Sequence, residues 1–571
     1  MYNFLHNTPF TFSDLPALAC KHSIVPIPTI LHQSHSIPLT SRTLLAQNLP
    51  PTQLYSFPSK LHGFHISHQE QQINLKPKTV RKLSKTCKPI RDSTKDGSTM
   101  TYNSPFLAPK DLFMASNLNI ILANPTNSDI KTLSSFLTRP NHLKTLKLSI
   151  NFKHISNQTA HCLFYDLRNL NGLENLSIDF QSCSNLHDKS IKILSMSLKS
   201  FSCLLSLKIN FIDAKRLTNK SASILATNFR YLKSLLSLDI NFNSWNLTDS
   251  AMGTLITGLN RLHSLVDLAL NFQFRKITGS GLKLSLETLK TLNLNLFGCT
   301  ELNEEGLKTV ALGLQNLQSL EQIHLNFGLC KQISDKQVSA LGQSLQQLPR
   351  LYNLHIDFEA CIEITANGIQ EISKLPHLEI LNINLSGCTE IAKPDFRAFS
   401  SGFKNLNSLK ELTLDFFGCS SFSDESLQAL SERLSEKAYL KRLDLVVPAP
   451  SVTDQGVQNL AESLGTMRSL NNFSLGFGGN FRNLPQITDK SIESLSKNLK
   501  GLTNLSDLFL CFNFCRNISN QGLVTLSDSL KGLNSLKVLK YNFFCGLHIG
   551  ENEKEILMRV NTPQMILNHW K

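Results

Sequence analysis

The sequence lacks any run of about 20 consecutive apolar residues, which is the length that a membrane-spanning helix requires. Its first 20 residues also lack the basic start and the uninterrupted apolar stretch of a secretory signal. The 13 cysteines are odd in number and cannot all pair within the chain, so we expect a reducing compartment, the cytoplasm. Tryptophan is scarce, with two residues in 571, which leaves little for a ring-stacking surface.

The sequence also lacks the motifs of the common enzyme classes. It contains no nucleotide-binding loop, kinase signature, HExxH pair or nucleophile elbow. Three glycines gather at positions 476, 478 and 479, but they do not open a strand–turn–helix unit with an acidic residue downstream. We therefore expect a protein that is not an enzyme, with no catalytic residue, cofactor, metal or small-molecule substrate.

The net charge of +14 is concentrated near the N-terminus. Residues 1–104 hold eleven lysines and arginines against four acidic residues, which is half of the excess. A basic segment, residues 76–91, leaves nuclear import open as an alternative to the cytoplasm. The concave strand positions described below show no basic stripe interleaved with aromatic residues, so we expect nucleic-acid binding only through this segment.

Periodicity divides the chain into four parts. Residues 1–104 are rich in Pro, His, Ser and Gln and show no sustained period of 2 or 3.6, which predicts a disordered basic tail. We expect an N-terminal capping segment in residues 105–140, a repeat array of about 14 units in residues 141–546, and a C-terminal cap or tail in residues 547–571.

The repeat array is recognised by three apolar residues that alternate with polar ones. Most units are 30 or 31 residues long, but the unit from Leu268 has 24 and the unit from Phe473 has 35. The first apolar residues are Leu146, Leu176, Leu207, Leu238, Leu268, Leu292, Ile323, Leu354, Leu381, Leu412, Leu443, Phe473, Leu508 and Leu539.

One unit shows how each repeat is expected to fold. Ile323, Leu325 and Phe327 alternate with polar residues, which predicts a strand with one buried face. Ser334 and Asp335 then predict a helix start, with the hydroxyl as cap and the carboxylate against the dipole of the same helix. The expected buried stripe of the helix is Val338, Leu341, Leu345 and Leu348.

A repeated strand and helix predicts an α/β solenoid with parallel strands, because a chain that returns to the same sheet edge needs a crossover. All helices then lie on one side. Helices are wider than the strand spacing, so the stack curves into a horseshoe or open superhelix, with the sheet on the concave face and the helices on the convex face.

The block Leu289, Leu292 and Leu294, followed by Cys299, resembles the leucine-rich repeats over about residues 128–546. Cysteine recurs at the same place as Cys183, Cys330, Cys361, Cys388, Cys419 and Cys515. These features resemble the cysteine-containing and ribonuclease-inhibitor-like subclasses, although units of about 31 residues are long for the family. Because cysteines so far apart in sequence form a file along a solenoid and do not converge on one point, we interpret them as small buried side chains and not as zinc ligands.

The resemblance implies a protein-binding scaffold that uses its concave face and rim loops. It leaves two alternatives. A substrate receptor of a ubiquitin ligase would need an adaptor-binding F-box module, which residues 105–127 do not resemble. A GTPase-activating regulator of the Ran type would need residues that we cannot assign.

The candidate binding residues lie at the polar strand positions. An amide and carboxylate file is formed by Asn210, Asn241, Asn271, Asn295, Asn326, Asp357, Asn384 and Asp415. It has two interpretations, hydrogen bonds from repeat to repeat or a polar surface for a protein partner. The neighbouring column is more varied, which suits specificity, and consists of Asp239, Ala269, Asn293, His324, His355, Asn382, Thr413 and Asp444. A metal between His324 and His355, with Asp357 and Glu359 nearby, is an alternative to solvated imidazoles.

Two irregular units complete the predictions. The 35-residue unit contains residues 476–486, which should bulge from the rim and expose Phe481 and Arg482 to a partner. The 24-residue unit that begins at Leu268 is too short for a full helix and should bend the solenoid locally.

Overall fold

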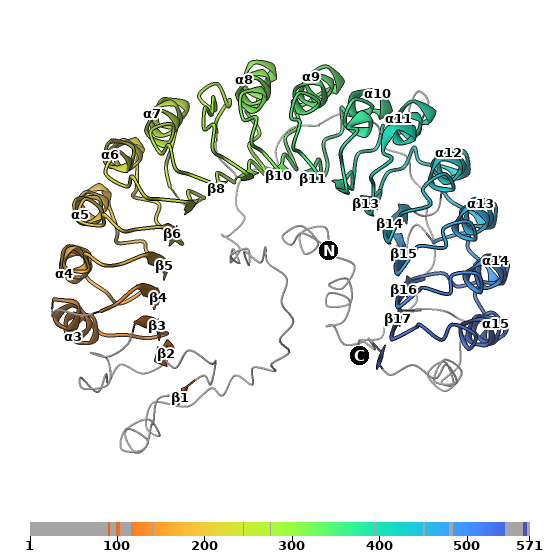
Figure 1. The fold of residues 1–571 in the computed structure, drawn as a ribbon, viewed down its shortest axis with the longest axis horizontal. Helices are drawn as coiled ribbons and strands as arrows, with labels where there is room; N and C mark the ends of the chain where they lie inside the picture. Colours follow the sequence, from red (N-terminus) through yellow and green to blue (C-terminus); the bar gives the residue numbers. More distant parts are fainter. Residues whose placement is uncertain are drawn as a thin grey trace, which may run out of the picture.

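Strands and helices alternate along the chain in one curved array, with the strands on the inner side and the helices on the outer side (Figure 1). The computed structural model describes residues 90–91, 99–102, 116–138, 142–243, 245–273, 276–392, 396–448, 451–478, 484–542 and 564–567. The predicted α/β solenoid of leucine-rich-repeat type is confirmed, with its parallel sheet on the concave face and its helices on the convex face.

The described residues form an 18-stranded sheet. Its strands are β1 (Ile90–Arg91), β2 (Thr99–Tyr102), β3 (Asn117–Leu122), β4 (Thr145–Asn151), β5 (Asn175–Gln181), β6 (Ser206–Phe211), β7 (Ser237–Asn241), β8 (Asp267–Asn271), β9 (Thr291–Asn295), β10 (Gln322–Asn326), β11 (Asn353–Asp357), β12 (Ile380–Asn384), β13 (Glu411–Asp415), β14 (Arg442–Pro448), β15 (Asn472–Gly478), β16 (Asp507–Cys511), β17 (Val538–Asn542) and β18 (Gln564–Leu567).

The outer layer consists of α-helices and short 3-10 turns. The helices are α3 (Asn127–Leu137), α4 (Asn157–Asp166), α5 (Asp188–Leu198), α6 (Asn219–Phe229), α7 (Asp249–Leu259), α8 (Glu304–Gln315), α9 (Asp335–Leu345), α10 (Ala366–Ile369), α11 (Arg397–Gly402), α12 (Asp424–Leu434), α13 (Asp454–Leu464), α14 (Asp489–Leu499) and α15 (Asn520–Leu530). The 3-10 turns are η2 (Leu167–Asn169), η3 (Ile372–Lys374) and η4 (Phe403–Asn405). Among the described residues, no helix combines the length and the apolar character needed to cross a bilayer.

The strands pair in the register that the repeat pattern predicts. β1 is antiparallel to β2, and every later strand pairs in parallel with the next one in the chain. The fourteen predicted first apolar residues, from Leu146 to Leu539, stand opposite one another in one continuous line. One more unit precedes them, because Leu118 of β3 pairs with Leu146 and α3 packs on α4.

One hydrophobic core runs the length of the array, from Leu118 to Tyr541. The third inward position of many strands is a phenylalanine, and these rings stack from repeat to repeat: the ring centroids of Phe327 and Phe358 are 5.8 Å apart, and those of Phe242 and Phe272 are 5.0 Å apart. Each repeat therefore buries its apolar side on its neighbours, as expected for a solenoid.

The buried cysteines also link neighbouring repeats. The Cys361 thiol donates a hydrogen bond to the Phe327 carbonyl at 3.2 Å, and the Cys330 thiol donates to the Leu296 carbonyl at 3.3 Å. Cys299, Cys388 and Cys419 make the equivalent bond. The predicted burial is confirmed, and it raises the pKa of the Cys330 thiol. The thiols act as donors between repeats, a role that the sequence did not reveal.

The Asp residues at the helix starts also act between repeats. Asp335 Oδ1 accepts the Thr365 backbone N–H at 2.7 Å, and its Oδ2 accepts the Thr365 hydroxyl at 2.5 Å, so it holds the N-cap residue of the next helix. The same pattern joins Asp188 to Thr218, Asp424 to Thr453, Asp454 to Thr488 and Asp489 to Ser519. The sequence predicted only that each Asp favours the dipole of its own helix, and it did not predict these bonds to the next repeat.

The 24-residue unit has lost its helix, as predicted. Between β8 and β9 the described residues form coil, which lies between α7 and α8 in the outer layer (Figure 1). Glycine permits the close packing of this coil, because a Cβ on Gly306 of α8 would lie 1.6 Å from the Thr278 carbonyl oxygen. The local bend expected for this unit stays a prediction.

Candidate functional site

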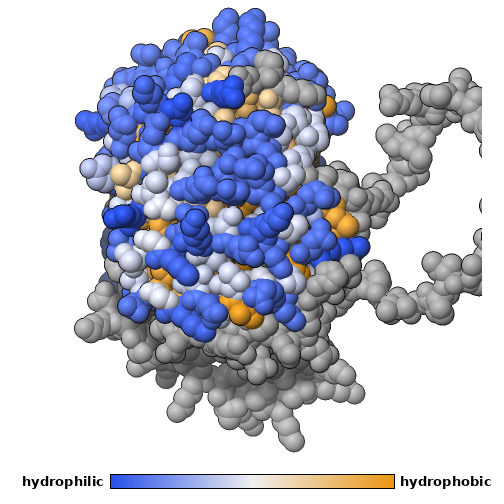
Figure 2. Space-filling view, turned by 90° about the vertical axis from the view of Figure 1, so that its right-hand side faces the viewer, coloured by the Kyte–Doolittle hydropathy of each residue, from blue (hydrophilic) through white to orange (hydrophobic). Residues whose placement is uncertain are grey.

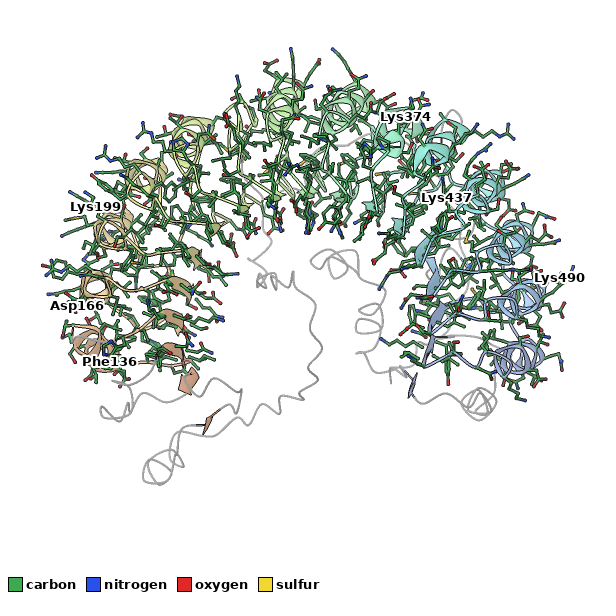
Figure 3. All side chains as sticks on the ribbon, in the orientation of Figure 1. Phe136, Asp166, Lys199, Lys374, Lys437 and Lys490 are labelled. Carbon is green, nitrogen blue, oxygen red and sulfur yellow. The ribbon has the colours of Figure 1, made fainter. Side chains whose placement is uncertain are left out.

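The concave face consists of the side chains that alternate with the buried ones on β4 to β17, and on β4 to β13 these side chains are mostly polar. On β10, for example, Ile323 and Leu325 are buried in the core, so the intervening His324 lies on the opposite face. Figure 3 shows side chains projecting into the inside of the arc from these strands, away from the helices. The two predicted columns of candidate binding residues lie on this face.

The amide and carboxylate file has a local structural role. Asn326 Oδ1 accepts the Gly328 backbone N–H at 2.9 Å, and Asp357 Oδ1 accepts the Glu359 backbone N–H at 2.8 Å. Asn241, Asn271, Asn295, Asn384 and Asp415 accept in the same way from the residue two positions later. Asn and Asp are suited to this turn because their side-chain oxygen reaches that N–H. The two interpretations drawn from the sequence did not include it.

Bonds from repeat to repeat also occur in the file, as one of the two interpretations expects. Asn241 Nδ2 donates to Asn210 Oδ1 at 2.9 Å, and Asn210 Nδ2 donates to Asp179 Oδ1 at 2.9 Å. Asn326 Nδ2 donates to Asp357 Oδ2 at 3.3 Å. Asn210, Asn295 and Asn326 are buried. These bonds give the file a structural function, and its contact with a partner stays a prediction.

Carboxyl groups gather near the middle of the concave face, with Asp357 on β11, Glu359 just after it and Asp415 on β13. Withdrawal from water raises the pKa of Asp357 and that of Asp415 to about 6. Burial, with repulsion from Asp357 and Asp415, raises the pKa of Glu359 to about 8. Asn384 lies on β12 between the two aspartates and donates to Asp357. Among the described residues, neither Asp357 nor Asp415 is in an ion pair.

We expect that replacing Asp415 with asparagine stabilises the protein at alkaline pH. The amide oxygen can still accept the Phe417 N–H, as Asn384 does for Ser386 on the neighbouring strand. The folded-state pKa of Asp415 lies above the ordinary value, so the cost of ionising it is fully present above pH 6 and disappears as the pH falls toward 4. The variant should gain roughly 1–3 kcal/mol at pH 8 and little at pH 4.

Urea unfolding of both proteins at the two pH values tests this expectation. The matched control is Asp528→Asn, which removes a carboxylate that is 60% exposed and pairs with Lys531 at the surface. Such pairs contribute about 0–1 kcal/mol, so the control should change little at either pH. Equal stability of Asp415→Asn and the parent at pH 8 would contradict the proposed cost.

The two predicted histidines are neighbours. His324 and His355 stand opposite each other on β10 and β11, and their ring centroids are 5.7 Å apart. Burial and repulsion from His355 lower the pKa of His324 to about 4, and burial lowers the pKa of His355. Both imidazoles are therefore neutral near pH 7. In the part of the chain that the structure describes, no group of three or more His, Cys, Asp or Glu side chains is placed to hold a metal ion.

The concave face becomes apolar toward the C-terminal strands, which the sequence reading missed. The column of the amide file continues as Val446, Gly476 and Cys511 on β14, β15 and β16. Phe509 and Cys511 form a small cluster apart from the main core, with Val446 packed against it. The sequence contains the signal for this change, because the column that holds Asn or Asp as far as Asp415 holds Val446, Gly476 and Cys511 on the next three strands.

The predicted rim residues Phe481 and Arg482 lie outside the described residues, as do the basic segment apart from Ile90 and Arg91 and most of the expected N- and C-terminal tails. For these parts the predictions stand as made.

Comparison with known proteins adds little to these observations. No family model and no curated protein matches the chain. A solved structure of the yeast Rad7 and Elc1 complex is 17% identical over 78% of this chain and 88% of that chain, with a TM-score of 0.37. The tropomodulin C-terminal domain of Caenorhabditis elegans is 13% identical over 29% of this chain and 90% of that domain, with a TM-score of 0.22. At these scores neither likeness supports an argument about function.

Proposed function

We propose that this protein is a non-catalytic scaffold that binds another protein on its concave face. The observation that carries the proposal is the arrangement of the layers: the helices cover one side of the sheet, and the other side faces the inside of the arc (Figure 1). Side chains project into the arc from this open side (Figure 3), and on β4 to β13 they are mostly polar. A surface that is built from many parallel strands and faces inward suits an extended protein contact.

The distribution of residue types also favours the concave face. Next to the uniform amide file, the second column changes from Asn293 to His324, His355, Asn382 and Thr413 along successive strands. Variation on a fixed backbone provides distinct contacts, which recognition requires. The side of the arc that carries α12 to α15 is also mostly hydrophilic, with only scattered apolar residues (Figure 2), so the concave face is favoured by its varied column and not by its polarity.

Three finer points belong to the same proposal. The cysteine that recurs at one buried position of the repeats fits the cysteine-containing, ribonuclease-inhibitor-like subclasses that the repeat motif resembles. The described cysteines are free thiols, which supports a reducing compartment, the cytoplasm. In the described part of segment 105–127, residues 117–122 form strand β3 of the array, which lends no support to a separate adaptor-binding module there.

Affinity purification with the full chain tests the concave face. The test variant is Asn293→Arg with Asn382→Arg, which places two cations in the varied column on β9 and β12. The control is Gln428→Arg with Gln458→Arg on the exposed sides of α12 and α13, where glutamates four residues later preserve helix pairing.

We expect the test variant to recover at least about tenfold less of any partner that the parent recovers, because an unmatched charge in an interface costs several kcal/mol. The control should recover the same proteins as the parent. Equal recovery by all three proteins would show that the concave face is not the binding surface.

A further inference from the structure

One strand presents a continuous line of hydrogen-bond acceptors on the concave face. Leu354 and Ile356 of β11 and the following Phe358 are buried in the core, so the residues between and beside them face the other way. These are Asn353, His355 and Asp357 of the strand and Glu359 just beyond it, which we call the acceptor row. Because its pKa is raised to about 8, Glu359 is mostly protonated near pH 7 and accepts through the carbonyl oxygen of its carboxyl group. His355 is neutral near pH 7 and offers one ring nitrogen as an acceptor, and each carboxylate oxygen accepts more than one hydrogen bond.

The first member of the row has an acceptor without a donor. Asn353 is 7% exposed, and its side-chain oxygen Oδ1 has no hydrogen-bond partner. Its Nδ2 donates to Gln322 Oε1 on β10 at 3.4 Å. This oxygen is enclosed in the structure, so a ligand N–H group reaches it only when the amide turns toward the concave surface. A buried acceptor left unsatisfied costs about 1–3 kcal/mol, which such a contact would recover.

The carboxylates of Asp357 and Asp415 also favour a ligand that donates hydrogen bonds. Asp357 is held by neutral donors, the Asn326 and Asn384 amides and the Glu359 backbone N–H. Asp415, two strands away, accepts the Phe417 backbone N–H, and the charged group that acts on it is Asp357, another anion. A cation placed between the two aspartates, beside Asn384 of β12, would interact with both carboxylates in surroundings less polar than water.

Lysine and arginine side chains combine both requirements. Each provides several N–H donors and no acceptor, and each is positively charged. Arginine also pairs with carboxylates through two parallel hydrogen bonds. We propose that the acceptor row, together with Asp415, binds a lysine- or arginine-bearing segment of the protein partner. This inference rests on the proposed function, since it names the chemistry of the partner at the concave face.

A synthetic peptide provides the direct test with the full chain. The probe is a peptide of alternating arginine and serine, and its matched control contains citrulline, which keeps the side-chain shape and removes the charge. The protein variant is Asp357→Asn with Asp415→Asn, which retains the turn acceptors that asparagine provides on the neighbouring strands. The control variant is Glu432→Gln with Asp528→Asn, on the exposed sides of α12 and α15.

We expect the arginine peptide to bind the parent and the control variant alike in a fluorescence titration. The Asp357→Asn, Asp415→Asn variant and the citrulline peptide should each weaken binding at least tenfold. Raising the salt concentration from 0.05 to 0.5 M should weaken binding to the parent more than binding to the variant. Urea unfolding of the variant shows that a loss of binding is not a loss of fold.

Other outcomes would overturn the inference. Equal binding of the two peptides, or no binding to the parent, would show that the row does not recognise cations. Stronger binding after Lys76, Lys78, Arg81 and Lys82 are replaced by serine would assign the row to this chain's own basic segment and not to a partner. Failure of the peptide test with continued loss of partners in the Asn293→Arg, Asn382→Arg variant would reject the inference and leave the proposed function intact.

Discussion

Replacing Gly306 with alanine should destabilise the protein by roughly 3 kcal/mol or more. The new Cβ would lie 1.6 Å from the Thr278 carbonyl oxygen and 2.7 Å from its carbonyl carbon, which are backbone atoms. Thr278 cannot easily move, because Asp249 accepts its backbone N–H at 3.0 and 3.1 Å. Either α8 or the coil of the helix-less unit must therefore shift. Urea unfolding followed by circular dichroism measures the loss.

A second glycine provides the matched control. Gly253 lies inside α7, and a Cβ added there has no heavy atom within 4 Å. Alanine is favoured over glycine in a helix by about 1 kcal/mol, so Gly253→Ala should leave stability unchanged or raise it. If both variants unfold at the same urea concentration, the close contact at Gly306 does not constrain the fold.

The second large effect is expected for Phe327→Ala. The ring is completely buried and stacks on Phe358, so its removal leaves a cavity that the neighbouring repeats cannot fill. Truncation of a buried phenylalanine costs about 3–5 kcal/mol. Phe327→Leu is the control, because leucine occupies the same column at Leu296 and Leu385, and it should cost about 1 kcal/mol. Equal midpoints of urea unfolding for the two variants would contradict this account.

The strand register was predictable because it depends on a period that the sequence repeats. Leu292, Ile323 and Leu354 are about 31 residues apart, and any solenoid of such units must place them side by side. The lost helix after Leu268 was predictable for the same reason, since 24 residues do not contain a strand, two connections and a helix. The unit at Leu118 was not predicted as a repeat, because residues 105–140 were interpreted as a capping segment.

Contacts between repeats were harder to predict. The bond from Asp335 to Thr365 and the bond from the Cys361 thiol to Phe327 join residues about 30 positions apart, and their existence depends on how closely the repeats stack. The raised pKa of Asp415 depends on the water that neighbouring side chains exclude. The sequence places these residues on the correct face, but distance and solvent access are properties of the folded array.

The coil between β8 and β9 divides the outer layer into two stretches. Helix α7 packs on α6, and α8 packs on α9, while the two stretches meet across coil. In a solenoid, cooperativity passes from each unit to the next through their shared surface. Across this point the sheet and the buried Leu282, Leu284 and Leu286 of the coil transmit that cooperativity, because the unit contributes no helix of its own. If the array unfolds in steps, we therefore expect the boundary between the two blocks to lie at this unit, where the outer layer lacks a helix.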